Sequence, residues 1–167
     1  MKRIISLTAV FVIFAGCIKD RYSGADLRVG DSLPDFEVVM NDGTVISDDI
    51  LKETVSVVMF FHTTCPDCQQ TLPQMQKIYD EYRTENVLFA LISREDNNSD
   101  VETYWRKNAF NMPYSAQGSR DVYEKFAQIG IPRVYINEKG GIIRYMFTDD
   151  PTPSYFDIKS ALDSIIR

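Results

Sequence analysis

Two cysteines spaced as Cys-x-x-Cys are the residues of this chain best suited to chemistry. Cys65 and Cys68 lie about one helical turn apart, close enough to form a disulfide with each other. The loop that they would enclose is too short to stabilise a large part of a fold, and Cys17 is the only other cysteine. Zinc would need two more ligands, whereas the chain has one histidine, His62. The spacing therefore favours reversible thiol–disulfide chemistry, with no metal and no other cofactor.

The residues around the pair indicate which cysteine is the nucleophile. A cysteine at the first turn of a helix faces unpaired backbone N–H groups and the positive end of the helix dipole, and both stabilise a thiolate. We expect Cys65 in this position, with Pro66 as the first helical residue, where a missing N–H costs nothing. Cys68 should lie deeper and resolve the mixed disulfide. Asp67 is expected to be solvated, and its charge opposes a neighbouring thiolate.

His62 precedes Cys65 by three residues and has two interpretations. As a cation it would stabilise the Cys65 thiolate, and as a neutral side chain it would only fill the end of a strand. No acidic partner for it is evident in the sequence, so we expect the second role.

The segments next to the cysteines are a buried strand and an amphipathic helix. Residues 55–61 (VSVVMFF) form a continuous apolar run, which is typical of a strand buried on both faces. After Cys68, apolar residues recur at spacings of three and four as far as Tyr82, which predicts a long helix with a kink near Pro73.

Strands and helices alternate through the rest of the chain. We expect a hairpin at 36–46, strands at 87–92, 132–136 and 142–147, and helices at 99–109, 121–129 and 154–166. The first of these helices should begin with a capping box, in which Ser99 is the N-cap and Glu102 follows three residues later. The alternation implies parallel crossovers, and the hairpin near the end implies an antiparallel edge. The predicted fold class is therefore α/β, a mixed sheet flanked by helices on both faces.

The first residues have the pattern of an export signal. A basic start is followed by about a dozen mostly apolar residues, which is short for a membrane span of roughly 20. The phrase Phe-Ala-Gly-Cys, which ends at Cys17, resembles a bacterial lipobox, whose cysteine carries the lipid, such as palmitate, and becomes the mature N-terminus. We expect a lipoprotein signal peptide at 1–16, the lipidated cysteine and a tether at 17–30, and one domain at 31–167. An uncleaved N-terminal anchor is the alternative.

Composition limits the classes of partner. With 167 residues, 44% hydrophobic and 25% charged, the chain suits one soluble domain with its own core, which we expect to be monomeric. The net charge is −6, and no cluster of Lys and Arg is present. Binding to nucleic acid is therefore not expected, because phosphate contacts need such clusters.

Together these features resemble the thioredoxin superfamily, and within it the TlpA/ResA-like group of exported thiol–disulfide oxidoreductases. The resemblance covers residues 29–167 and rests on VGDSLPDF (29–36), FFHTTCPDC (60–68), Pro73 and Gly130-Ile131-Pro132. It implies a thioredoxin-like fold with Ile131 and a cis-Pro132 beside the cysteines. It also implies protein thiols or disulfides as partners, an upstream electron donor or acceptor, and a location in the bacterial cell envelope, facing the periplasm or another extracytoplasmic side.

Three positions depart from the pattern of the group. Thr64 stands where most members have tryptophan, Met59 where thioredoxin has a buried aspartate, and Thr71 where ResA-like members often have glutamate. The usual carboxylates for proton transfer are therefore missing at both of the latter positions.

Two other functions remain open. A peroxiredoxin has the same fold but needs Thr or Ser three residues before its reactive cysteine, where this chain has His62. A non-enzymatic binding module on the same scaffold is the second alternative, because a fold does not determine function.

Overall fold

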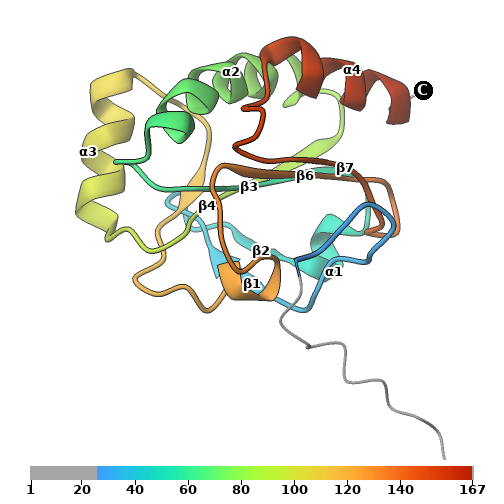
Figure 1. Cartoon of the computed structure of the whole chain (residues 1–167), viewed down its shortest axis with the longest axis horizontal. Coiled ribbons are helices and arrows are strands. Elements are labelled where there is room, and N and C mark those ends of the chain that lie inside the picture. Colours follow the sequence, from blue (N-terminus) through green and yellow to red (C-terminus); the bar gives the residue numbers. More distant parts are fainter. Residues whose placement is uncertain (1–25, 167) are drawn as a thin grey trace, which may run out of the picture.

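A five-stranded mixed sheet forms the centre of the protein (Figure 1). The computed structural model describes residues 26–166. In sheet order the strands are β5 (Tyr114–Ser115), β4 (Val87–Ser93), β3 (Val55–Phe61), β6 (Arg133–Asn137) and β7 (Ile143–Phe147). Parallel pairing joins β3, β4 and β5, and antiparallel pairing joins β3, β6 and β7. The expected parallel crossovers and antiparallel edge are both confirmed.

β3 is the central strand, and its composition explains its position. All of its residues except Val55 are buried, as a strand covered on both faces requires. Its last residue, Phe61, leads directly into the loop that carries Cys65. The cysteine pair therefore lies at the carboxyl end of the central strand β3.

Helices lie on both faces of the sheet (Figure 1). α2 (Pro66–Tyr82) and α4 (Tyr155–Ile165) cover one face, and α3 (Asn98–Asn108) lies toward the β4–β5 side. On the opposite face lie the short helix α1 (Asp48–Leu51), the 3₁₀ turn η1 (Tyr123–Lys125) and the hairpin of β1 (Glu37–Val39) and β2 (Val45–Ser47). The predicted thioredoxin-like α/β class is confirmed.

The helix expected at 121–129 is wrong, because only the 3₁₀ turn at 123–125 forms there. The backbone N–H of Gln128 donates to the carboxylate of Asp26 at 2.7 Å, and the carbonyl of Phe126 accepts the N–H of Leu27 at 2.9 Å. These backbone groups pair with the segment at the start of the domain instead of continuing a helix.

The start of α3 also differs from the prediction. Asn97, not Ser99, is the N-cap residue, and its side chain accepts the N–H of Asp100 at 3.0 Å. The expected capping box at this helix is therefore not formed. A capping box does occur at the start of α4, between Ser154 and Asp157.

The predicted signal peptide, the lipidation site Cys17 and most of the predicted tether fall in residues 1–25, outside the described residues. The end of the predicted tether does contact the domain, because Gly30 donates its N–H to the carbonyl of Ile143 at 2.8 Å. From residue 26 to residue 166, no helix combines the length and apolar character that crossing a membrane requires.

Candidate active site

Cys65 is the N-cap residue of α2, where the first backbone donors of the helix are unpaired. Its backbone is extended (φ −76°, ψ 120°), and its Sγ accepts the backbone N–H of Cys68 at 3.3 Å. Pro66 takes the first helical position, as expected. The Cys65 side chain is only half-buried, so its sulfur meets the helix dipole and remains accessible. This arrangement suits a thiolate that attacks a partner.

Cys68 has a different environment, one turn further along the helix. It is fully buried, and burial raises the pKa of its thiol, with a further increase from the hydrogen bond to Cys65 and a smaller one from the charge of Asp67. Asp67 itself is only half-exposed. The two thiols are free of a disulfide. The cysteines therefore differ in exposure in the way that a nucleophile and a resolving thiol require.

The loop before β6 lies against Cys65. The Ile131–Pro132 peptide bond is cis, and the Cys65 thiol donates to the carbonyl oxygen of Ile131 at 3.5 Å. Gly130 has a φ of +83°, and a Cβ at this position would lie 3.1 Å from Oδ1 of Asp149. Both the backbone and the available space therefore favour glycine here. The loop that carries Ile131 and Pro132 is thus next to the sulfur of Cys65.

His62 has an acidic partner, Asp96, that the sequence analysis missed. The Nε2 atom of His62 lies 3.1 Å from Oδ1 of Asp96, whose side chain is 3% exposed. The Nδ1 atom lies 3.2 Å from the backbone nitrogen of Thr64 and 3.0 Å from its hydroxyl oxygen. Because a backbone N–H can only donate, Nδ1 accepts and Nε2 carries the proton that faces Asp96. The expectation that His62 has no acidic partner is therefore wrong, whereas its role at the end of the strand stays a prediction.

Asp96 also holds the residue that follows His62. One carboxylate oxygen accepts the backbone N–H of Thr63 at 2.7 Å, and the other accepts the Thr63 hydroxyl at 3.3 Å. The three residues before Cys65 are thus connected, directly or through His62, to one buried carboxylate. Asp96 therefore fixes the loop that presents Cys65.

The parallel pairing of β3 and β4 explains why Asp96 reaches this loop. Phe61 is opposite Ser93 in the register, so the residues that follow the two strands meet at one edge of the sheet. An acidic residue just after the second strand was therefore a usable signal, since sites commonly form at the carboxyl ends of parallel strands. Met59 and Thr71, the two positions at which the resemblance implies carboxylates, are both buried here.

An ion pair between Arg133 and Asp26 holds the loop that carries Ile131 and Pro132. Arg133 is 7% exposed and donates from Nη2 to Oδ2 of Asp26 at 2.7 Å and to the carbonyl of Ile129 at 2.8 Å. The other oxygen of Asp26 accepts the N–H of Gln128 at 2.7 Å. Partial burial would raise the pKa of Asp26, but these hydrogen bonds outweigh that effect and hold the pKa below its usual value. The segment on both sides of Pro132 is therefore held by one carboxylate.

Thiol chemistry is what these side chains can perform together. Across residues 26–166, no three His, Cys, Asp or Glu side chains converge as a metal site would need. The polar groups next to Cys65 are instead a backbone N–H and a backbone carbonyl, which suit a thiolate and an approaching polypeptide chain.

Curated relatives carry names that describe this chemistry. Sporulation thiol-disulfide oxidoreductase A of Bacillus subtilis is 26% identical over 143 residues, which are 81% of this chain and 86% of the relative. The thiol-disulfide oxidoreductase ResA of Halalkalibacterium halodurans is 22% identical over 142 residues, 84% of this chain and 79% of the relative.

Solved structures share the fold. A putative protein disulfide isomerase from Bacteroides thetaiotaomicron matches with a TM-score of 0.78 and 19% identity, over 86% of this chain and 92% of that one. StoA from Bacillus subtilis matches with a TM-score of 0.67 and 21% identity, over 79% and 99%. Residues 29–146 match the AhpC/TSA family, which is most of the chain. The chain therefore belongs to the AhpC/TSA family.

Proposed function

We propose that this protein is a thiol–disulfide oxidoreductase that reduces disulfides of other proteins through Cys65 and Cys68. The observation that carries the proposal is the position of the Cys65 sulfur. It caps α2, accepts the N–H of Cys68 at 3.3 Å and lies 3.5 Å from the carbonyl of Ile131. The names of the curated relatives support the same reaction.

The reaction has two displacement steps. The Cys65 thiolate attacks one sulfur of the partner disulfide, the partner S–S bond breaks, and the departing thiolate takes a proton. Cys68 then loses its proton and attacks the sulfur of Cys65, which releases the second partner thiol. The protein dithiol is thereby oxidised to a disulfide, and the partner disulfide is reduced to two thiols. A dithiol donor upstream must supply two electrons to begin the next cycle.

The surroundings of the cysteines favour a reductant over an oxidant. An oxidant stabilises its reduced form as a thiolate, whereas the charge of Asp67, between the two cysteines, opposes a thiolate here. The Nε2 atom of His62 faces the buried carboxylate of Asp96 at 3.1 Å, so the imidazole is paired with that carboxylate. We therefore expect a reduction potential nearer the roughly −270 mV of thioredoxin than the roughly −120 mV of DsbA.

The location belongs to the same proposal. The signal pattern and the lipobox-like phrase before Cys17 support a protein anchored by lipid at the outer side of a bacterial cytoplasmic membrane or within the envelope. Its partners would then be exported proteins, in a compartment where disulfides form and persist.

Reduction of insulin by the purified domain, monitored by turbidity, tests the proposal. Cys68→Ser should accumulate mixed disulfides with partner proteins, because Cys65 still attacks and resolution is lost, whereas Cys65→Ser should capture none. Capture by Cys65→Ser alone would reverse the two roles. No capture by either variant, with folding intact, would favour the binding-module alternative.

Reactivity with hydrogen peroxide distinguishes a peroxiredoxin from the proposed thiol–disulfide oxidoreductase. His62 occupies the position of the required Thr or Ser, and both of its ring nitrogens are already engaged by Asp96 and Thr64. We therefore expect hydrogen peroxide to oxidise the reduced protein no faster than it oxidises a free cysteine of the same thiolate fraction. Rapid and selective consumption of peroxide would instead support the alternative.

A further inference from the structure

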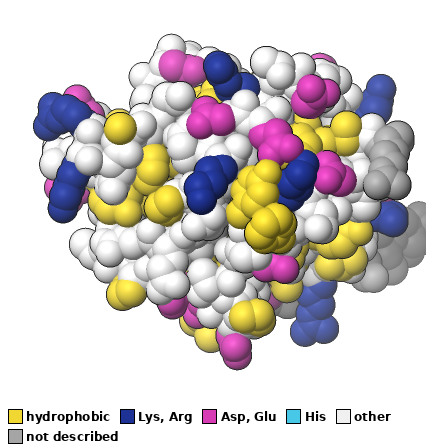
Figure 2. Space-filling model, turned by 90° about the horizontal axis from the view of Figure 1, so that it is seen from above, with side chains coloured by type: hydrophobic (Ala, Val, Ile, Leu, Met, Phe, Trp, Pro, Cys, Tyr) yellow, Lys and Arg dark blue, Asp and Glu magenta, His cyan; other side chains and the backbone are white. Residues whose placement is uncertain are grey.

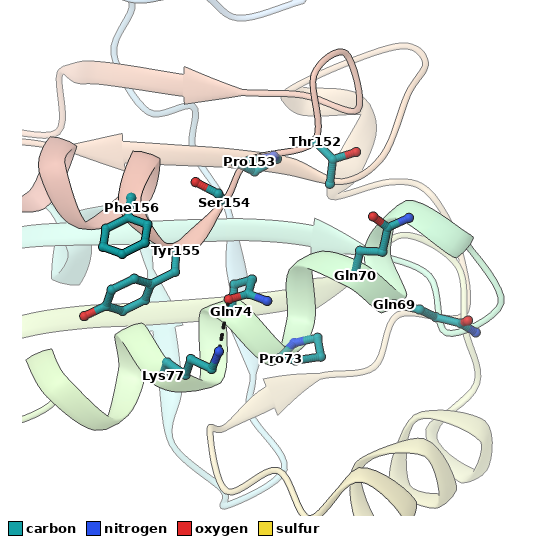
Figure 3. Close-up of a pocket in the computed structure, with 10 residues that line it drawn as sticks. All are labelled: Gln69, Gln70, Pro73, Gln74, Lys77, Thr152, Pro153, Ser154, Tyr155 and Phe156. Carbon is teal, nitrogen blue, oxygen red and sulfur yellow. Dashed lines mark hydrogen bonds between the residues drawn. The ribbon is translucent and has the colours of Figure 1, made fainter.

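An open groove runs along α2 beside the segment that leads into α4. Viewed from above the α2–α4 face, hydrophobic side chains gather in the middle of the surface, next to Lys or Arg side chains (Figure 2). The groove has a volume of about 790 Å³, and Figure 3 shows the residues that line it. The residues that matter below are Gln70, Pro73, Gln74, Lys77, Pro153 and Phe156.

The groove begins where the candidate active site ends. Gln69, which lines the groove, directly follows Cys68 in the sequence. Its backbone N–H donates to the carbonyl of Cys65 at 3.0 Å, and its side-chain amide donates to the carbonyl of Thr63 at 2.8 Å. A polypeptide joined to Cys65 by a disulfide therefore has this groove beside it.

The walls of the groove offer three kinds of contact, namely apolar, amide and charged. Phe156, at the start of α4, is 74% exposed. It faces the groove together with Pro73 and Pro153 from the two sides (Figure 3). The amides of Gln70 and Gln74 can pair with the backbone of an extended chain.

Lys77 gives the groove its charge. It is the only charged side chain in the lining, and its described contact is a hydrogen bond from Nζ to Oε1 of Gln74 at 3.3 Å (Figure 3). Among residues 26–166, no carboxylate lies within ion-pair distance of it, although the chain as a whole is acidic. A positive charge at one end of an otherwise uncharged groove favours an anionic group of the ligand.

We propose that this groove binds the extended segment that flanks the reactive cysteine of a partner protein, with an apolar side chain against Phe156 and an acidic side chain at Lys77. The inference rests on the proposed function, because the partner must first reach Cys65. The groove would select among protein disulfides, and the cysteine pair would perform the exchange.

The spacing of the partner residues follows from the helix. From Cys65 to Lys77, α2 advances about 18 Å at a rise of about 1.5 Å per residue. An extended chain covers this distance in about five residues at roughly 3.3 Å each. The acidic residue should therefore lie about five positions from the partner cysteine. Phe156 lies at the Lys77 end of the groove (Figure 3), so the apolar residue should lie about six positions from the cysteine.

The test uses short synthetic peptides with one cysteine, blocked as a mixed disulfide with thionitrobenzoate. One peptide has Glu five residues and Phe six residues from the cysteine, and a matched peptide has Lys in place of Glu. Each is made with the motif before and after the cysteine, so that both chain directions are sampled. Reduction by the reduced full domain releases the thionitrobenzoate anion, whose absorbance gives the second-order rate constant.

We expect the Glu peptide to react about fivefold faster than the Lys peptide at low ionic strength in one of the two directions, with the difference reduced at high salt. Lys77→Glu should reverse the preference. Lys139→Glu makes the same change of charge at an exposed turn between β6 and β7, so it should keep the preference of the unaltered protein.

Phe156→Ser tests the apolar contact. It should slow the Phe peptides by about three- to tenfold relative to matched peptides with Ser in place of Phe. Val39→Ser removes a comparably exposed apolar side chain from β1, on the opposite face of the sheet, and should leave this ratio unchanged.

The outcomes separate the groove from the redox reaction. Equal rates for the Glu and Lys peptides in the unaltered protein would overturn the inference while leaving the proposed function intact. Failure to reduce any probe, including dithiobis(nitrobenzoate) without a peptide, would overturn the proposed function itself. A concentration-dependent dimer that Phe156→Ser abolishes would assign the groove to a second copy of the chain and would also overturn the inference.

Discussion

Replacing Asp96 with Asn tests whether the loop before Cys65 depends on a buried carboxylate. The side-chain oxygen of an asparagine can still accept the N–H of Thr63, which lies 2.7 Å from the Asp96 carboxylate in this structure. The amide NH₂, however, faces the Nε2–H of His62 and the hydroxyl of Thr63, which approach the carboxylate at 3.1 and 3.3 Å. The Thr63 hydroxyl can turn and accept from this amide, but the Nε2–H of His62 meets a donor. His62 can adapt only by moving its proton to Nδ1, where it loses the N–H of Thr64.

The expected loss of stability is about 3 kcal/mol. Hydrogen bonds to charged groups contribute roughly 1.5–3 kcal/mol each; the one from His62 is lost, and the two from Thr63 no longer involve a charge. For a domain of this size that loss lowers Tm by about 6–12 °C. Urea unfolding of the reduced protein, with circular dichroism, measures it. Asp35→Asn is the matched control, since Asp35 is exposed and the same isosteric change there should cost less than about 0.5 kcal/mol.

The redox readout distinguishes a positioning role from general stabilisation. Thr63 and Cys65 are two residues apart, so their Cα atoms lie within about 8 Å, and the Asp96 charge is bonded to Thr63. Removing that charge should favour the thiolate and make the reduction potential about 10–30 mV less negative. The reasoning would be refuted by a loss below about 1 kcal/mol together with an unchanged potential.

Four further results are expected. In the reduced protein, limiting iodoacetamide near pH 7 should label Cys65 and spare Cys68, because burial raises the pKa of the Cys68 thiol; peptide mass mapping reads the ratio, and equal labelling would contradict it. Asp26→Asn should lower stability more near pH 7 than near pH 3: the folded-state pKa of Asp26 is depressed, so its contribution is fully present above the unfolded pKa of about 3.9 and is lost as the pH falls through the folded-state pKa. Urea midpoints at the two pH values give the comparison, and an equally large loss in acid would count against the ion pair. Gly130→Ala should cost more than the roughly 1–2 kcal/mol of a strained left-handed residue, because its Cβ would also meet Asp149 at 3.1 Å, whereas Gly43→Ala, with φ +86° and open space, should cost only the backbone part. Cys17→Ser should move the full-length protein from the membrane fraction to the soluble fraction of cells, and unchanged fractionation would exclude a lipid on Cys17.

The sequence predicted the parts of the fold that depend on local patterning. The apolar run at 55–61 forms β3 with these bounds, and the position of Cys65 and Pro66 at the start of α2 was predictable from helix-capping rules. Both signals involve residues that are neighbours in the chain. They needed no knowledge of what the rest of the chain contacts.

The features that were missed depend on contacts between distant segments. Asp96 reaches Thr63 across 33 positions, and Asp26 reaches Gln128 across 102. The second contact takes the N–H of Gln128, and a helix that periodicity favoured at 121–129 stops after one 3₁₀ turn. Tertiary hydrogen bonds here override a local preference worth only tenths of a kcal/mol per residue.

The contact between Asp26 and Arg133 also has a mechanical consequence. Asp26 is where the described domain begins, and its carboxylate holds the guanidinium of the residue that follows Pro132. A force applied through the N-terminal end of the chain is therefore transmitted to the loop beside Cys65 before it reaches the central strands. If the protein is held at that end, tension on the attachment and the geometry of disulfide exchange are coupled through the contacts of Asp26 with Arg133 and Gln128.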